Sequence, residues 1–188
     1  MKLKMYKIIF LVLFLFLIAI LSLIGIQYTE RQKNEVKNKT ILKQLEGTQV
    51  ADVELAFNDV KVIGKIYIPN INIEYPILEK TDAQTMKMAI TKFNGGNIND
   101  YGNLALAGHN NRDGTMFGKT KELQLGDWIE LTDLTKRTIQ YEITEIFLTD
   151  PNDVSILNTR DENVREITLI TCSNGNKNRL IIKAVEKK

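Results

Sequence analysis

The segment Ile167-Thr168-Leu169-Ile170-Thr171-Cys172 guides the interpretation of this 188-residue chain. Its β-branched and apolar residues favour a buried β-strand, because such side chains pack well on a pleated, covered surface. Cys172 is the only cysteine and stands at the end of that strand. Turn-forming residues 173–178 follow, and Arg179 opens the next apolar run. If the two strands are neighbours, Cys172 and Arg179 lie next to each other at one end of a sheet.

The sequence contains one histidine, His109. It follows the short apolar strand Leu104-Ala105-Leu106-Ala107 and precedes the turn-rich segment 110–114. Loops that follow strands commonly carry catalytic groups. Taken alone, however, an isolated histidine is more often a surface residue of no consequence, and a lone cysteine is more often a small buried hydrophobe.

A cysteine, a histidine and an arginine at strand ends supply the groups that acyl transfer through a thiol requires. A thiolate is the nucleophile, and an imidazole exchanges protons with the leaving and incoming groups. A guanidinium can hold the carbonyl oxygen, whose negative charge grows in the tetrahedral intermediate. Cys172, His109 and Arg179 therefore form a candidate catalytic set.

The N-terminal region has the character of a membrane anchor. Residues 8–26 are apolar except for Ser22 and Gly25, and a helix of this length spans a hydrocarbon core of about 30 Å. A cleaved signal peptide is the alternative, but the apolar run is longer than usual for one and no small-residue cleavage site follows. Lysines precede the span, whereas the few basic residues just after it are accompanied by glutamates. Because positive charge favours the cytoplasmic side, we predict a single-pass cell-membrane protein with a cytoplasmic N-terminus and an extracellular domain.

The chain divides into three predicted regions. Residues 1–28 form a cytoplasmic tail and transmembrane anchor, residues 29–59 a stalk or linker whose helical part ends at Gly47, and residues 60–188 one domain. Without the lysines that precede the span, the formal net charge falls from +2 to about −1. Such a weak field does not favour nucleic acid, and we expect no nucleic-acid partner.

The predicted domain is mostly β. Apolar alternation between turn signals indicates about eight strands, and residues 82–90 have the composition of a short helix with Thr81 or Asp82 as its N-cap. Because the alternation runs throughout with few glycines in the turns, we predict a closed or nearly closed β-barrel.

Three ordered motifs carry a resemblance to a known family: Ala107-Gly108-His109, Thr168-Leu169-Ile170-Thr171-Cys172 and Arg179. Together with segments 63–71 and 102–106, they make the chain resemble the sortases, membrane-anchored cysteine transpeptidases of Gram-positive-type cell envelopes. The resemblance covers nearly the whole predicted domain. It implies an eight-stranded sortase-type β-barrel with short helices, preceded by an N-terminal transmembrane helix.

The resemblance also implies an activity. Cys172 would attack the Thr–Gly bond of a Leu-Pro-x-Thr-Gly-like sorting signal at the C-terminus of a surface protein and form a thioacyl enzyme. An amine of a peptidoglycan precursor would then resolve it. His109 would be the acid and base, and Arg179 would steady the substrate carbonyl or oxyanion. By the same resemblance, three further residues would border the sorting-signal groove: Ala107, Ile170 and Thr171.

The resemblance is to class A-like or class D-like sortases. The connection between residues 148 and 167 is too short for the long helix of class B members, and no obvious lid segment precedes the barrel. Some class A members bind calcium near the loop that corresponds to residues 94–101. Here Asp100 is the one carboxylate of that loop, whereas calcium takes six or more oxygen ligands. We therefore expect neither a metal nor another cofactor.

Two other functions remain compatible with the sequence. In a secreted cysteine peptidase the same cysteine and histidine would act, but water would resolve the thioacyl intermediate. In a non-catalytic, membrane-tethered β-domain, the surface would bind an envelope partner, and Cys172 would have no chemical role.

Overall fold

The computed structural model describes residues 2–47 and 56–187. One long helix, α1 (Lys2–Gly47), ends at Gly47 as the sequence predicts. Its apolar part is long and apolar enough to cross a membrane, judged by length and composition. The chain forms two compact units, Met1–Val36 and Lys37–Lys188, so the last part of α1 belongs to the unit that contains the strands. Residues 48–55 of the predicted linker lie outside the described residues.

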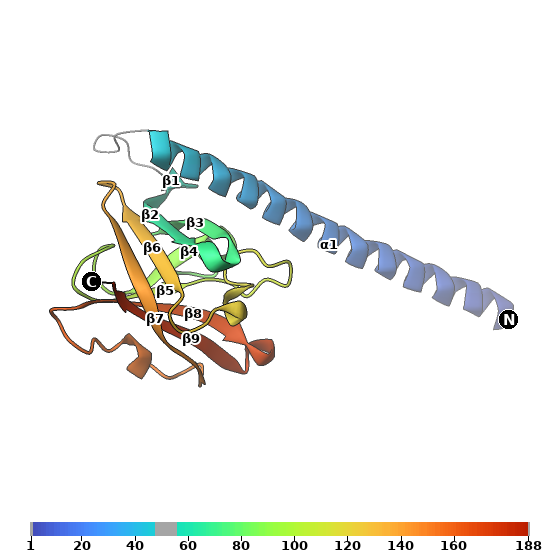
Figure 1. Ribbon diagram of the computed structural model, residues 1–188. Helices are drawn as coiled ribbons and strands as arrows, with labels where there is room; N and C mark the ends of the chain where they lie inside the picture. The colour runs from blue at the N-terminus through green and yellow to red at the C-terminus, as the bar shows by residue number, and fades with distance from the viewer. Residues whose placement is uncertain (1, 48–55, 188) are drawn as a thin grey trace. The chain divides into compact units, whose positions relative to one another are not determined.

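The described part of the second unit is built mainly from strands joined by short 3₁₀ helices (Figure 1). The strands are β1 (Ala56–Phe57), β2 (Val60–Ile68), β3 (Ile73–Leu78), β4 (Ile90–Asn94), β5 (Gly102–Ala107), β6 (Trp128–Asp133), β7 (Thr138–Thr149), β8 (Arg165–Ser173) and β9 (Asn178–Glu186). The 3₁₀ helices are η2 (Pro69–Ile71), η3 (Thr85–Lys87), η4 (Thr120–Glu122), η5 (Ser155–Leu157) and η6 (Asn174–Asn176).

Eight of these strands close into a barrel. The hydrogen-bonded order is β2-β3-β4-β5-β8-β9-β7-β6, and the pairing of β6 with β2 closes the ring. Within residues 56–187, the two-residue strand β1 pairs only with β2, at the edge. Most neighbours are antiparallel, but β3 with β4 and β5 with β8 are parallel. The predicted closed eight-stranded barrel is therefore confirmed, and the parallel pair of β5 with β8 is the part of its topology that decides where the site lies.

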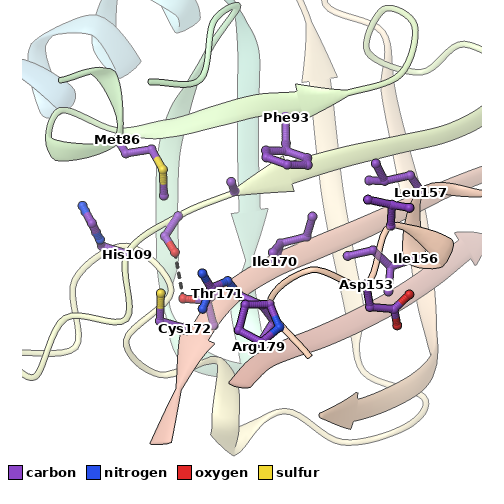
Figure 2. Close-up of a pocket in the computed structure, with 14 residues that line it drawn as sticks. Met86, Phe93, His109, Asp153, Ile156, Leu157, Ile170, Thr171, Cys172 and Arg179 are labelled. Carbon is purple, nitrogen blue, oxygen red and sulfur yellow. Dashed lines mark hydrogen bonds between the residues drawn. The ribbon is translucent and has the colours of Figure 1, made fainter. Parts of the chain in front are cut away.

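Strands β5, β8 and β9 are covered on both faces. Leu169 and Ile182 turn into the barrel interior. Their sequence neighbours Ile170 and Ile181 turn outward and pack against Ile156 on the segment between β7 and β8. Figure 2 shows Ile170 and Ile156 of this cluster. Both faces are therefore apolar, which explains why β8 is buried continuously over its middle residues. The outer face of these strands is the floor on which the site is built.

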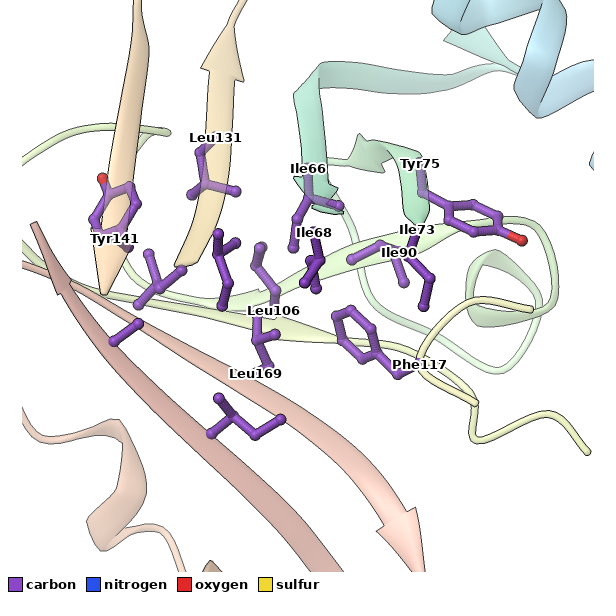
Figure 3. Packing of buried hydrophobic residues seen from close by; sticks show 14 of the residues in the cluster. Ile66, Ile68, Ile73, Tyr75, Ile90, Leu106, Phe117, Leu131, Tyr141 and Leu169 are labelled. Carbon is purple, nitrogen blue, oxygen red and sulfur yellow. The ribbon is translucent and has the colours of Figure 1, made fainter. Parts of the chain in front are cut away.

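The barrel interior is filled by apolar side chains from all eight barrel strands. Figure 3 shows Ile66 and Leu131 pointing inward from β2 and β6, toward Leu106 and Leu169 on β5 and β8. Phe117, on the loop after β5, packs among them and is almost fully buried. A barrel of eight strands is just wide enough for side chains to fill it, so removal of this apolar surface from water is the main stabilising contribution.

The predicted helix over residues 82–90 is wrong. The carboxylate of Asp82 accepts hydrogen bonds from the backbone N–H groups of Gln84 and Thr85, as an N-cap does. The turn that follows is only the 3₁₀ helix η3, and Ile90 already belongs to β4. Strand β4 pairs with β3 on one side and β5 on the other. Tertiary strand pairing of β-branched residues thus overrides the local helical composition.

The C-terminal end of α1 packs on the barrel wall. Ile41, Leu42 and Leu45 are buried and form a cluster with Met88, in the turn after η3. The side-chain amide of Asn38 donates a hydrogen bond of 2.9 Å to the carbonyl oxygen of Met88. This part of α1 therefore supports the segment between β3 and β4.

Candidate active site

Strand pairing puts the three candidate catalytic residues in one row. β5 and β8 run parallel with Ala107 opposite Ile170. His109 and Cys172 each stand two residues further along, so both leave the sheet at the same end. On the other side of β8, Arg179 of β9 lies opposite Cys172. His109, which is distant in the sequence, therefore meets Cys172 and Arg179 at the end of three adjacent strands.

All three line one pocket of about 350 Å³ on the outer face of the barrel. Figure 2 shows His109 and Cys172 at one end of this pocket and Leu157 at the other. Its lining includes the six predicted site residues: Ala107, His109, Ile170, Thr171, Cys172 and Arg179. The three residues predicted to border a substrate groove form part of the floor and are almost fully buried, whereas Cys172 is half-buried.

Close packing fixes the backbone that carries His109. A Cβ atom on Gly108 would lie 2.6 Å from Cδ1 of Ile90 and 2.8 Å from Cδ2 of Phe117, so only glycine fits without displacing core side chains. The N–H of Gly108 donates to the carbonyl oxygen of Ile170 at 3.2 Å, and the N–H of Phe117 donates to that of His109 at 3.0 Å. The backbone at the start of the His109 loop is therefore held in place by packing and by hydrogen bonds.

Two side-chain hydrogen bonds join the His109 segment to the Cys172 strand. The hydroxyl of Thr171 donates to the carbonyl oxygen of Gly108 at 2.7 Å, and this bond is buried (Figure 2). The side-chain amide of Asn110 donates to the carbonyl oxygen of Cys172 at 2.8 Å. Together the two bonds hold the backbone before His109 and the backbone at Cys172 at a fixed spacing.

Arg179 stands at the start of β9, where the chain leaves the short loop after β8. One nitrogen of its guanidinium lies 3.4 Å and 3.3 Å from the carbonyl oxygens of Asn176 and Asn178. Both are long for hydrogen bonds of this type. A planar guanidinium presents five N–H donors, so this group can turn toward a carbonyl oxygen bound beside Cys172.

The far wall of the pocket is the connection between β7 and β8. It places Val154, Ile156 and Leu157 over the outer face of the sheet. The carboxylate of Asp153 holds this wall, because it accepts hydrogen bonds from the hydroxyls of Ser155 and Thr149 and from the N–H of Ser155. These bonds stabilise the charged form and keep the pKa of Asp153 below its ordinary value.

Comparison with known proteins assigns the family. A family model described as the sortase domain matches residues 66–187, which include every residue of the row above. The chain belongs to the sortase family.

Individual sortases resemble this one at moderate identity. Sortase A of Listeria monocytogenes is 34% identical over 113 residues, covering 59% of this chain and 49% of the relative. Sortase D of Bacillus subtilis is 32% identical over 145 residues, covering 77% of this chain and 64% of the relative. The chain thus spans about half to two thirds of the length of these curated relatives.

A solved structure also matches the sortase barrel. It is that of a Clostridium perfringens Sortase D5 transpeptidase, which superposes with a TM-score of 0.68 at 29% identity. The match covers 82% of this chain and 98% of that one. The similar proteins include a sortase A and sortases D, the two classes that the sequence resembles.

Sequence reasoning missed two walls of this sortase's pocket. Met86 in η3 and Phe93 on β4 form one side. A helix over residues 82–90 gives no reason to assign Met86 to the site, and no sequence motif marks Phe93. The other side holds Val154 and Leu157 in a segment dense in Asp, Asn and Pro. Apolar residues in such a turn-rich segment are a signal that something apolar is covered there.

Within the described residues, no group of three or more His, Cys, Asp or Glu side chains is arranged to hold a metal ion. Asp100, the one carboxylate in the loop considered for calcium, accepts hydrogen bonds from the backbone and side-chain amides of Asn97.

Proposed function

We propose that this chain is a membrane-anchored cysteine transpeptidase that attaches surface proteins to a cell-wall precursor. The observation that carries the proposal is the row of His109, Cys172 and Arg179 at the mouth of one apolar pocket. Its substrate is a protein with a C-terminal Leu-Pro-x-Thr-Gly-like sorting signal. Its acceptor is an amine of a peptidoglycan precursor.

The pocket suits the apolar part of such a signal. Ile156 of the far wall packs against Ile170 of the floor, and Val154, on the rim, is largely exposed. A leucine and a proline would remove this surface from water, a favourable change for apolar groups. An extended peptide seated there would present its threonine carbonyl at the end where Cys172 stands.

The first half of the reaction forms a thioester. The sulfur of Cys172 attacks the threonine carbonyl carbon, and the negative charge that develops on the oxygen is stabilised by the guanidinium of Arg179. The tetrahedral intermediate then collapses and the C–N bond breaks. The departing glycine amine takes a proton from the imidazolium of His109. The acyl group is left on sulfur, and His109 is neutral.

The second half reverses these roles. The nitrogen of the acceptor amine attacks the thioester carbon, and a C–N bond forms while the C–S bond breaks. The electron pair of that bond returns to sulfur as thiolate, and the proton of the amine passes to His109. The thiolate and imidazolium of the starting state are restored, so atoms and charges balance over the cycle.

The location follows from the same proposal. The apolar part of α1 would cross the membrane with its N-terminal lysines in the cytoplasm. The barrel would then stand outside the cell, where both the surface protein and the wall precursor occur.

The decisive experiment incubates the chain with peptides of the form Leu-Pro-x-Thr-Gly, with and without an amine acceptor. We expect a thioester on Cys172, detected as a mass increase of the protein, and a ligated product when amine is present. Cys172→Ala should abolish both, and Gln140→Ala, on an exposed part of β7 away from the pocket, should not. Hydrolysis at a rate unaffected by amine would identify a peptidase instead. Absence of any thioester would refute the catalytic proposal.

A further inference from the structure

A second cleft opens on the other side of Cys172. It has a volume of about 480 Å³ and lies between the His109 loop and the loop after β8. Among the described residues, Cys172 is the one residue that lines both this cleft and the apolar pocket. Cys172 therefore lies where two separate binding spaces meet.

The two spaces differ in chemistry. The first pocket is lined mainly by apolar side chains. The second is lined by the carboxamides of Asn110, Asn174 and Asn176 and by the cations of Arg112 and Lys121. No acidic side chain is among its lining residues in the described part of the chain. The second cleft therefore suits a polar ligand with negative charge.

The direction of the proposed reaction assigns a role to this cleft. In acyl transfer the incoming amine retraces the path of the departing amine, because one imidazole serves both proton transfers. The acyl group occupies the apolar pocket during the thioester stage. The acceptor amine must therefore reach the thioester from the other side of Cys172, which is the polar cleft.

We propose that the polar cleft binds the amine acceptor, and that this acceptor carries a carboxylate, which Arg112 and Lys121 recognise. This inference rests on the proposed transpeptidase function. Arginine pairs with carboxylates through two parallel hydrogen bonds, and lysine adds a point charge. The step it serves forms a C–N bond, breaks the C–S bond, returns the electron pair to sulfur and passes the amine proton to His109.

The charges around the cleft determine how strongly it should prefer a charged acceptor. Asp113, next to Arg112, accepts hydrogen bonds from the N–H and hydroxyl of Thr115 and does not line the cleft. Arg112 and Lys121 are both exposed. Exposed ion pairs contribute modestly, so the two cations give selectivity between acceptors of about fivefold to tenfold.

The test compares two acceptors that differ in one charge, Nα-acetyl-lysine and Nα-acetyl-lysinamide. Their reacting amines are remote from the altered group and have similar basicity. With saturating sorting-signal peptide, we expect kcat/KM for the carboxylate to exceed that for the amide by about fivefold to tenfold. The preference should shrink in about 0.5 M salt, where the screening length falls to on the order of 4 Å.

Substitutions test which side chains cause the preference for the carboxylate acceptor. The double substitution Arg112→Gln with Lys121→Gln should bring the ratio of the two kcat/KM values close to one, and Arg112→Glu should favour the amide. Lys119→Gln removes an exposed lysine on the same segment that does not line the cleft, and it should leave the ratio unchanged. Because each variant is judged by a ratio, a general loss of activity does not obscure the result.

The outcomes separate this inference from the proposed function. Equal use of both acceptors by the unmodified chain, at low and high salt, would overturn the carboxylate assignment and leave the transpeptidase intact. A preference that survives the double substitution would overturn the role of Arg112 and Lys121. Thioester formation without ligation of either acceptor would overturn both proposals.

Discussion

Cys172 on β8 lies directly opposite Arg179 on β9, as a register pair of two antiparallel strands. Opposite residues of such a pair have Cβ atoms about 5 Å apart, on the same face of the sheet. The backbone ladder therefore holds the thiol and the guanidinium together. Their proximity does not depend on a contact between the side chains, so either one can be changed without displacing the other.

That independence makes Arg179 a clean test of oxyanion stabilisation. Arg179→Gln should lower the rate of thioester formation by about 10² to 10³, the usual cost of losing such a donor. Arg179→Lys keeps the charge but loses the planar guanidinium, so its rate of thioester formation should lie between those of the unmodified chain and Arg179→Gln. The measurement is the single-turnover rate of acylation with a sorting-signal peptide. Lys177→Gln, an exposed change in the preceding loop, is the control, and a rate for Arg179→Gln equal to that of the control would contradict the role.

Thr171 is expected to position the thiol against the imidazole. Its buried hydroxyl bonds to the carbonyl of Gly108, directly before His109. Thr171→Val keeps the shape but leaves that carbonyl unpaired, which costs about 1–3 kcal/mol of unfolding free energy. We also expect kcat to fall about tenfold, because a small misplacement of reacting groups is costly. Thr171→Ser keeps the hydroxyl and should retain most of kcat. A loss of kcat in the Ser variant with none in the Val variant would show that the methyl group, not the hydrogen bond, matters.

The β8–β9 half of the site could be predicted from the sequence. Two apolar segments separated by the turn-rich residues 173–178 indicate neighbouring strands. The structure pairs them, and their partners are close in the sequence. The meeting of His109 with Cys172 could not be derived in the same way. It depends on the parallel pairing of β5 with β8, and the long connection between these strands carries no local signal for it. Resemblance to a family supplied that part.

The walls of the pocket were beyond sequence reasoning for a different reason. Residues 82–90 have a helical composition, but the pairing of Ile90 with β3 outweighs it and moves Met86 to the pocket. The segment that holds Ile156 has no periodicity that could show which side chains face the sheet. In both cases partners distant in the chain decide the conformation, and local propensity is the weaker effect.

Asp153 should make the pocket wall sensitive to acid. Its pKa is depressed by hydrogen bonds from Ser155 and Thr149 to the carboxylate. A depressed pKa gives stability that is fully present above the ordinary value of 3.8 and is lost as the pH falls through the folded-state value. Asp153→Asn should therefore be less stable than the unmodified chain at neutral pH, and the difference should disappear in acid, where both are uncharged.

The measurement is the midpoint of urea unfolding from pH 7 to about pH 2. Asp150→Asn changes a neighbouring exposed carboxylate that does not line the pocket, and it serves as the control. At neutral pH, the Asp153 variant should also show a raised KM for the peptide, because the wall that carries Val154 loses its support. A stability difference that stays constant across the pH range would contradict this account.

The C-terminal end of α1 is expected to act as part of the catalytic unit. Leu45 is buried against the cluster that includes Met88, and Met88 lies two residues after Met86 of the pocket wall. Leu45→Ala in the full chain should lower the free energy of unfolding by about 2–3 kcal/mol, within the range for buried leucines. It should also raise KM for the peptide, because the segment around η3 loses its backing. Val36→Ala, an exposed change in the same helix, should alter neither quantity by more than experimental error. If both variants behave alike, the end of α1 is only a tether, and the barrel forms its pocket without it.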